Sequence, residues 1–461
     1  MRLISALLLV ASLFGMPLAD AAPAPNAVPI VVLDRPRTEP SVAIDPRDPR
    51  IIAVAVNPTY RRNALGEEPV GIFVSHDSGV SWTKHDAPLL PPYTTGSDPS
   101  VAFTPSGTLY VAYEAVSNGF CGSTNQTAVL VTRSIDQGRS FSRPTLVNSN
   151  PANDKPYMAA GSAAGGHGDA VYVAWIRFQS DSAAQVVFSR SGNGGQTFSP
   201  PVPLSSGAGI HVAPQLAAAS GGRVYVGWMA GSALPGTVPP REWMETRGSF
   251  DAGAHFGPVG RTAPFWGPLG LEQPGSLRLF NGPSLAAGGQ HRVYMVWAQA
   301  QATHGVPVIV AGAVRATIVM SVSDDAGLHW ATPIAVNDST KGDRFEPQVA
   351  ASGNTALVAF YDRRRNGVDL DLELSVVHKT ASGLHAGPNV RLTSLPAPIA
   401  AIPFIPPGSP CLAQGRFFGD YIGLALHGTR AGVAWTGSTS TYRGQTDVRF
   451  ASVPLSALGA R

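Results

Sequence analysis

A short motif that recurs at nearly constant spacing constrains the fold of this chain more than any other feature of its sequence. The pattern is Ser-x-Asp/Asn-x-Gly-x-x-aromatic, and it occurs five times. The copies begin at Ser75, Ser134, Ser191, Ser249 and Ser323, so consecutive copies are 59, 57, 58 and 74 residues apart. A regular period of this kind indicates an array of similar structural units that pack side by side.

Each unit carries two further elements upstream of the motif. A proline opens the first one, at Pro40, Pro99, Pro156, Pro214, Pro283 and Pro347. A short apolar segment ending in an aromatic residue follows, as in Val111-Ala112-Tyr113 and Val173-Ala174-Trp175. These elements divide a unit into four short strands, A to D, bounded by Gly, Pro, Ser and Asp. Repeated four-stranded sheets predict an all-β fold, a β-propeller.

The blade count follows from the number of units. We predict seven blades, with six as the alternative, over residues 39–90, 97–148, 155–206, 212–262, 282–338, 345–395 and 417–457. The last blade lacks an outer strand, because its third strand, 447–453, lies close to the end of the sequence. Residues 27–34 match the outer strand of blade 5, 331–338, at five of eight positions. We therefore expect residues 29–34 to complete the last blade and 23–461 to form a single domain.

Composition agrees with this interpretation and excludes several classes of protein. Charged residues make up 14% of the chain, against about 25% in ordinary soluble proteins, and 50 glycines and 41 prolines favour many tight turns. A hydrophobic content of 44% argues against disorder. The net charge of +3 is spread evenly, so nucleic acid is not expected as a partner. No zinc motif, phosphate-binding loop or nucleophile elbow is found, and we expect no cofactor and no metal.

The N-terminus has the features of a signal peptide. Arg2 precedes an apolar stretch, 3–18, and Ala19-Asp20-Ala21 supplies the small residues that a signal peptidase requires. The alternative, a membrane anchor, is less favoured because the stretch is shorter than the roughly 20 residues that span a bilayer. We therefore expect residues 1–22 to be removed and the mature protein to be a secreted or periplasmic monomer. Its two cysteines, Cys121 and Cys411, then form one disulfide or remain as two buried thiols.

Topology predicts which face of the propeller carries function. In a four-stranded meander the D-to-A connections and B–C loops share one face, whereas the recurring motifs lie on the other. The longest of these loops are 262–281, 395–418, 117–126 and 231–241, and binding usually resides on such loops. The residues just before the strand A prolines should ring the mouth of the central channel on that face. They are Glu39, Asp98, Lys155, Ala213, Gly282 and Glu346, with Asp420 or Tyr421 at the seventh position.

Blade 6 adds a cluster of charges on the same face. Asp369, Asp371 and Glu373 alternate with leucines, so they share one face of a strand. We favour an ion-pair network in which these acids bind the arginines 363–365 and hold blades 6 and 7 together. A calcium site is the alternative, but one strand cannot supply the six to eight oxygen ligands that calcium takes.

The five motif copies resemble the Asp-box, or BNR repeat, of the sialidase superfamily. The motif is a turn-stabilising device, so the resemblance implies a propeller fold and a glycan as the partner rather than a mechanism. In a sialidase a Tyr nucleophile is paired with a Glu, an acid donates a proton, and three Arg bind the substrate carboxylate. The resemblance gives these roles to Tyr421 with Glu346, to Asp98, and to Arg177, Arg363 and Arg416.

Two departures from the sialidase pattern leave the activity open. The Arg-Ile-Pro segment of the first blade is absent, since the nearest match is Asp34-Arg35-Pro36-Arg37, and seven repeats differ from the six blades of that enzyme family. We expect an exo-glycosidase that acts on acidic, sialic-acid-type glycans. The alternatives are a non-catalytic glycan- or protein-binding propeller and a hydrolase or lyase of another specificity.

Overall fold

The computed structural model describes residues 30–34, 36–58, 66–117, 126–163, 168–180, 183–205, 209–231, 241–268, 277, 280–303, 306–307, 309–310, 313–393, 397–398, 404–405, 415–438 and 446–459. Apart from one short 3-10 helix, Leu455–Leu458, the regular elements in these ranges are β-strands, which confirms the predicted all-β class. No helix in these ranges has the length and apolarity needed to cross a bilayer. The expected signal peptide and both cysteines lie outside the described residues and stay predictions.

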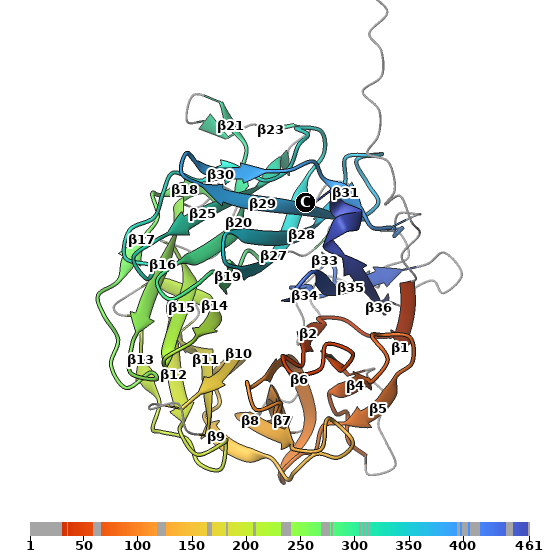
Figure 1. The fold of residues 1–461 in the computed structure, drawn as a ribbon, viewed down its shortest axis with the longest axis vertical. Coiled ribbons are helices and arrows are strands. Elements are labelled where there is room, and N and C mark those ends of the chain that lie inside the picture. Colours follow the sequence, from red (N-terminus) through yellow and green to blue (C-terminus); the bar gives the residue numbers. More distant parts are fainter. Residues whose placement is uncertain are drawn as a thin grey trace, which may run out of the picture.

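The strands form small antiparallel sheets that are arranged around a common axis, as in a β-propeller, with the first strand of each sheet nearest the axis (Figure 1). The first sheet contains β2 (Ser41–Ile44), β3 (Ile52–Val56), β4 (Gly71–Ser75) and β5 (Thr83–Asp86). The second contains β6 (Tyr93–Phe103), β7 (Leu109–Ser117), β8 (Thr127–Ser134) and β9 (Thr145–Ser149).

The next two units are joined by one parallel bridge, Ala184 to Ile210, into a nine-stranded sheet. One unit contains β10 (Asn153–Ser162), β11 (Asp169–Ser180), β12 (Ala183–Ser191) and β13 (Val202–Pro203). The other contains β14 (Ile210–Ala219), β15 (Arg223–Gly231), β16 (Arg241–Ser249), β17 (Gly260–Arg261) and β18 (Phe265–Trp266).

Two further sheets follow around the axis. One contains β19 (Ser284–Ala287), β20 (Val293–Ala300), β25 (Ala316–Ser323) and β26 (Ile334–Ala335). The other contains β27 (Arg344–Ser352), β28 (Thr355–Asp362), β29 (Asp371–Thr380), β30 (Gly383–Ala386) and β31 (Val390–Arg391).

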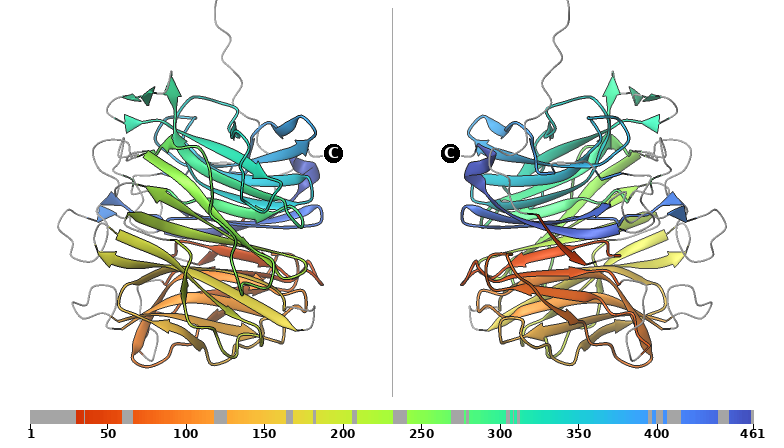
Figure 2. Two further views of the ribbon diagram at one scale, coloured as in Figure 1. Left: turned by 90° about the vertical axis from the view of Figure 1, so that its left-hand side faces the viewer. Right: turned by 90° about the vertical axis from the view of Figure 1, so that its right-hand side faces the viewer.

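Short two-residue strands form hairpins outside these sheets. They are β21 (Ala302–Thr303) with β22 (Val306–Pro307), β23 (Ile309–Val310) with β24 (Ala313–Val314), and β32 (Phe404–Ile405) with β33 (Gly415–Arg416). Side views place these hairpins on one side of the disc and the C-terminal end of the described chain on the other (Figure 2).

The two ends of the described chain meet in one sheet. β1 (Ile30–Asp34) pairs antiparallel with β36 (Thr446–Pro454), which pairs in turn with β35 (Arg430–Ser438) and β34 (Gly423–His427). Ile30 lies opposite Ala451 and Val31 opposite Phe450. Asp34, at the end of β1, accepts a hydrogen bond from Lys84 at 2.9 Å, which ties the N-terminal strand to the first sheet.

The core lies between neighbouring sheets. The second strand of a sheet, such as β7, is buried along its whole length, because both of its faces pack on a neighbouring sheet. Trp175, Trp228, Trp297 and Trp435 occur at corresponding places in four of these second strands and are at most 1% exposed. They therefore serve inter-sheet packing and not surface stacking on a sugar.

The recurring motifs stabilise the turns between strands by hydrogen bonds. In the first copy the Ser75 hydroxyl accepts a hydrogen bond from the Gly79 amide at 2.8 Å, and Asp77 accepts one from the Ser81 amide at 2.8 Å. The same Ser-to-Gly bond occurs in the other four copies. The motif aromatic then packs on the preceding sheet, as Trp82 does on Phe450 at a ring separation of 4.9 Å. Each motif thus fixes a hairpin and one contact between sheets.

We predict that the N-terminal strand is needed for a stable ring. Deleting residues 30–34 should expose the edge of β36 and lower both the melting temperature, by several degrees, and the solubility. The comparison is a chain that begins at Ala27 and keeps β1. Equal melting temperatures for the two proteins in a thermal denaturation experiment would contradict this role.

Candidate functional site

The residues expected at the channel mouth share an unusual backbone conformation. Glu39, Asp98, Lys155, Ala213 and Glu346 all have left-handed φ values, between 47° and 56°. This conformation costs on the order of 1 to 2 kcal/mol for a residue with a Cβ, and a following proline normally disfavours it further. Strain repeated at one position of five units indicates that the position is held by its surroundings and is a candidate for function.

β-Bulges produce this conformation. The pairing of the first two strands shifts between Ser97 and Ser100, and also between residues 154 and 157, 212 and 215, and 345 and 348. Each shift contains one mouth residue and its proline, which stand out of the strand pairing. A bulge redirects the side chain that it carries. Here it lets the side chains of different sheets approach one another near the axis.

The ammonium group of Lys155 is the centre of the mouth. Its Nζ lies 2.7 Å from Asp420, 3.1 Å from Asp98 and 3.6 Å from Glu39, and the Lys155 side chain is only 8% exposed. Burial alone would lower the pKa of Lys155, but Asp420, Asp98 and Glu39 outweigh it and raise the pKa well above its ordinary value. One lysine therefore remains charged and connects four different sheets.

Backbone and amide groups fix the acids around this lysine. Asn57 donates to the Glu39 carboxylate and accepts a hydrogen bond from the Asp98 amide at 2.8 Å. Glu39 also accepts a hydrogen bond from the amide of Asp420 at 3.1 Å. Of the two residues that the sequence offered for the seventh position, Asp420 is the one that binds Lys155. The carboxylates are thus held rigidly by groups from the first, second and last sheets.

A second group of carboxyls lies beside the first. Oxygen atoms of Asp98, Glu114 and Asp154 lie within 4.8 Å of one another, a spacing that a metal ion could bridge. Ser97 donates a hydrogen bond to Glu114 at 3.0 Å. Burial, together with the neighbouring charges of Asp154 and Asp98, raises the pKa of Glu114 well above its ordinary value. Glu114 can therefore carry a proton where an exposed glutamate would be ionised.

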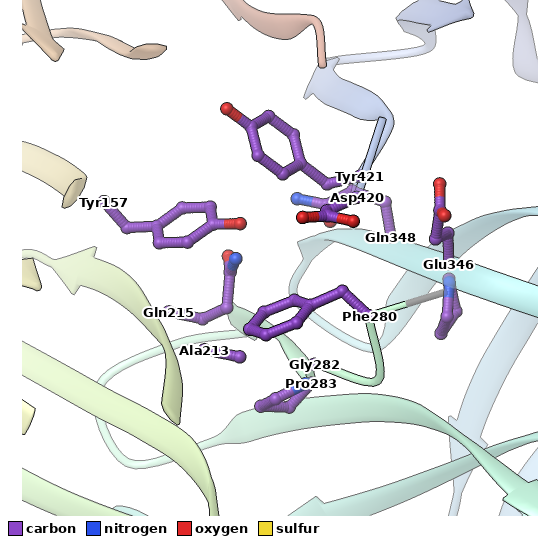
Figure 3. Close-up of a pocket in the computed structure, with 11 residues that line it drawn as sticks. Tyr157, Ala213, Gln215, Phe280, Gly282, Pro283, Glu346, Gln348, Asp420 and Tyr421 are labelled. Carbon is purple, nitrogen blue, oxygen red and sulfur yellow. The ribbon is translucent and has the colours of Figure 1, made fainter. Parts of the chain in front are cut away.

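The other half of the mouth is aromatic and apolar. Phe280 lies over Lys155, with 5.1 Å between the ring centroid and Nζ, and the rings of Tyr157 and Tyr421 meet edge to face at 5.5 Å (Figure 3). Ala213 and Gly282 line this side together with Phe280, and a Cβ at Gly282 would lie 2.7 Å from that of Ala213. The cavity beside Phe280 holds about 20 Å³, enough for a water molecule and too little for a sugar ring, and a second cavity of about 160 Å³ shares Tyr157 and Tyr421 with it.

The expected nucleophile pair shares this cavity without meeting in it. Tyr421 and Glu346 both line the cavity, but the Tyr421 hydroxyl points away from the Glu346 carboxylate (Figure 3). The hydroxyl donates to the carbonyl of Pro99 at 3.3 Å. Burial, followed by the charges of Glu39 and Asp98, raises the pKa of Tyr421 well above its ordinary value. In this state Tyr421 is a hydrogen-bond donor rather than an activated nucleophile.

The three arginines expected to bind a substrate carboxylate have separate surroundings. Arg177, in β11, donates to Asn148 at 3.2 Å. Arg363 is fully buried, donates to the carbonyl of Gly367 at 2.7 Å and lies 3.8 Å from Asp343. Arg416, in β33, lies opposite Phe404 of β32 in the pairing of these two strands. These partners differ from one arginine to the next, so the contacts described here do not gather the three guanidinium groups at one point.

Asp371, one of the three acids expected to pair with arginines 363–365, takes part in an ion-pair network. Asp371 pairs with Arg365 at 3.1 Å, and Asp362 binds Arg364 at 2.7 Å and Arg344 at 2.9 Å. Arg364 also binds Asp338, which follows β26, so the network reaches the preceding sheet. The expected link from blade 6 to blade 7 is made instead by Tyr361, whose hydroxyl donates to the Thr436 carbonyl at 2.9 Å.

The calcium alternative gains no support from this network. Asp371 is already bound by Arg365 and Thr393, and Asp369 accepts a hydrogen bond from Asn366. Burial raises the pKa of Glu373 to about 8, so this group is largely protonated at neutral pH. Within the described part of the chain, the carboxyls with metal-like spacing are those around Asp98 instead.

Sequence reasoning missed three contributors to the mouth. Asp154 directly precedes a residue that the repeat had singled out, and an acid beside a predicted ring position could have been included. Asn57 follows the second strand of the first sheet, and only the contact with Glu39 shows its role. Phe280 lies in the long connection 262–281, where no periodic signal exists.

No family model matches the chain, and no curated protein matches it. Among solved structures, a GH93 α-L-arabinofuranosidase of Fusarium graminearum is 10% identical, with a TM-score of 0.48, covering 92% of this chain and 95% of that one. The NanB sialidase from Streptococcus pneumoniae is 10% identical, with a TM-score of 0.45, covering 92% and 69%. The Hadza microbial sialidase Hz136 is 14% identical, with a TM-score of 0.44, covering 70% of this chain and 63% of that chain. At these identities the function has to be argued from this chain's own residues.

We predict that Lys155 is essential for the stability of the mouth. Lys155→Met keeps the aliphatic stem but leaves three carboxylates without their counter-ion, which should lower the free energy of unfolding by about 3 to 5 kcal/mol. Urea denaturation at neutral pH measures the loss. Lys84→Met, at an exposed ion pair, is the control and should cost less than about 1 kcal/mol. Equal small losses for the two variants would contradict the role of Lys155.

Proposed function

We propose that this protein is an exported glycoside hydrolase whose reaction centre is the mouth of the central channel. The observation that carries the proposal is the cluster of three carboxyl groups from Asp98, Glu114 and Asp154. In this cluster Glu114 is buried and has a raised pKa, and the other two carboxyl groups lie beside it. Hydrolysis of a glycosidic bond requires such a pair, because one group protonates the leaving oxygen while another stabilises or attacks the anomeric carbon.

The proposal assigns the two roles by environment. Glu114 is the proton donor, because its raised pKa keeps it protonated at higher pH than an ordinary glutamate. Asp98 is the partner carboxylate, because the ammonium group of Lys155 lies 3.1 Å from it. The residue expected as the acid from the resemblance thus takes the opposite role, and an adjacent strand supplies the acid.

The scaffold in this proposal is a seven-bladed ring closed by β1. Support comes from the pairing of β1 with β36 and from the mouth residues contributed by successive sheets. A closed ring would hold acids from several sheets in fixed positions, which reduces the reorganisation needed during reaction. The mouth is also amphipathic, with carboxylates on one side and Phe280 and Tyr157 on the other, as suits the polar edge and apolar face of a sugar ring.

Substrate entry requires a rearrangement, since the cavity holds only about 20 Å³. Phe280 is the side chain that we expect to move, because it lies above Lys155 in a connection between strands and not within a sheet. Its displacement would open the space between the tyrosines and the carboxylates. Closing again over a bound sugar would exclude water from the acids.

The sialic-acid version of this proposal assigns different residues. It makes Tyr421 the nucleophile, Glu346 its base, and Arg177, Arg363 and Arg416 the clamp for the sugar carboxylate. The acidic surroundings of Lys155 work against this version, because several carboxylates would repel an anionic sugar at the mouth. We therefore expect neutral glycosides to be better substrates than sialosides.

A non-catalytic, glycan-binding propeller is the second candidate. It is favoured by the same small cavity and by the ion pairs that already neutralise Glu39, Asp98 and Asp420. In that case the Lys155 cluster only holds the ring together. Activity measurements on the wild type and on matched variants separate the two candidates.

For the hydrolase, we predict that Glu114→Gln lowers kcat by about 100-fold or more on glycosides with poor leaving groups. The loss should be smaller for dinitrophenyl glycosides, whose leaving group needs little protonation. Wild-type activity should fall as the pH rises through the raised pKa of Glu114. Glu373→Gln, which alters a buried acid of raised pKa in blade 6, is the control and should keep full activity. If the folded wild type hydrolyses no member of a broad panel of glycosides, the hydrolase proposal is contradicted and the non-catalytic, glycan-binding propeller remains.

For the sialic-acid version, Tyr421→Phe is the decisive variant. If Tyr421 forms a covalent intermediate, the variant should lose turnover of a fluorogenic sialoside by several orders of magnitude and still bind the sugar. If Tyr421 only donates to Pro99, turnover of neutral glycosides should change by less than about tenfold, and the melting temperature should fall slightly. Steady-state kinetics and thermal denaturation on the same preparation distinguish these outcomes.

A further inference from the structure

A larger cavity lies away from the channel mouth, between the second sheet and the Asp-box of the third. It holds about 220 Å³, several times the roughly 30 Å³ that one water molecule occupies in the liquid. Strand pairing locates it on the other face of the disc. Ser134, which opens the second Asp-box, lies opposite Leu109, whereas Glu114 near the mouth lies further along the same strand. This cavity is therefore separate from the carboxyl groups discussed above.

The lining of this cavity is positively charged. Arg133 and Arg143 both contribute to it, together with the hydroxyl-bearing Ser142 and the amide of Gln196. Among the described residues, no carboxylate forms a salt bridge with either arginine. A guanidinium group has five N–H donors in a fixed, planar arrangement that suits oxyanions. Two such groups at one cavity form a binding site for a negative group.

Arg133 is held in place while Arg143 is not. The Arg133 guanidinium donates to the carbonyl of Gly194, in the Asp-box turn of the next sheet, and this bond fixes its direction. Thr145 fixes the same turn by donating to the carbonyl of Gly195 at 2.8 Å. Arg143 is exposed and lies on the segment that leads into β9. A fixed and an adjustable guanidinium are thus available to one ligand.

The equivalent groove at the next sheet, which contains Arg190, differs from the groove that contains Arg133 and Arg143. Arg190 corresponds to Arg133 there and donates to the carbonyl of Ala252 in the same way, so this bond occurs in both grooves. Ser199 corresponds to Ser142, but Pro200 occupies the place of Arg143. The second arginine therefore distinguishes this groove from the next one.

We propose that the groove between the second and third sheets is an oxyanion-binding site, which takes a sulfate or carboxylate group carried on a sugar. Arg133 and Arg143 bind the negative group, and Ser142 and Gln196 bind hydroxyls of the sugar ring. The volume of the cavity admits a ligand larger than a bare ion. The site does not depend on catalysis at the mouth.

Equilibrium binding of three sugars to the full chain tests the site. Glucose 6-sulfate and glucuronate should bind saturably in isothermal titration calorimetry at low salt, and glucose should not. Arg143→Gln should weaken the binding of the anionic sugars about tenfold or more, since it removes a charge-assisted contact. The folded state of this variant is secure because Arg143 is exposed. Raising the salt concentration should weaken binding further.

Arg190→Gln is the matched control, because it removes the equivalent guanidinium from the neighbouring groove. It should leave the affinity for glucose 6-sulfate unchanged within about twofold. If inorganic sulfate competes with the sulfated sugar in the wild type, charge recognition at the groove is supported. The proposal is overturned if neither anionic sugar binds the wild type, if glucose binds equally well, or if Arg143→Gln retains wild-type affinity.

Discussion

The ion cluster around Lys155 is the interaction on which the rest of the molecule depends. A single ammonium group is shared by carboxylates from the first, second and last sheets, at distances of 3.6, 3.1 and 2.7 Å. Burying this many charges is favourable only when they are mutually paired and further hydrogen-bonded, as they are here through Asn57 and the amide of Asp420. Glu39, Asp98 and Lys155 carry their groups on strained, left-handed backbone, and their ion pairs offset part of that strain.

The same cluster determines the chemistry of the mouth. Burial, together with the charges of Asp154 and Asp98, raises the pKa of Glu114 well above its ordinary value, although Lys155 acts in the opposite direction. On the aromatic side of the mouth the repeat has Ala213 and Gly282, which carry no charge and line the cavity together with Phe280. The groups that hold the sheets together at the axis thus place Glu114, Asp98 and the apolar side chain of Phe280 close to one another.

The sequence predicted the fold better than it predicted the site, for a physical reason. Turn chemistry and strand periodicity are local, so the motif that contains Ser75, Gly79 and Trp82 identifies a hairpin in each unit. Its recurrence along the chain then predicts a propeller. The mouth positions were also predictable, because they precede a proline in six of the seven predicted units. Contacts between Lys155 and Asp420, 265 residues apart, depend on the number and curvature of the sheets between them. The partners of Arg363 and the position of Phe280 are set by irregular connections, which have no period to interpret.

A double-mutant cycle between Lys155 and Asp420 tests the central claim most directly. The free energy of unfolding is measured for the wild type, Lys155→Met, Asp420→Asn and the double variant. If the cluster joins the sheets, the two substitutions should be coupled by about 1 to 3 kcal/mol, the double variant being more stable than the sum of the single losses implies. A coupling energy near zero would mean that the two groups act independently, and that the ring is held together without this ion cluster.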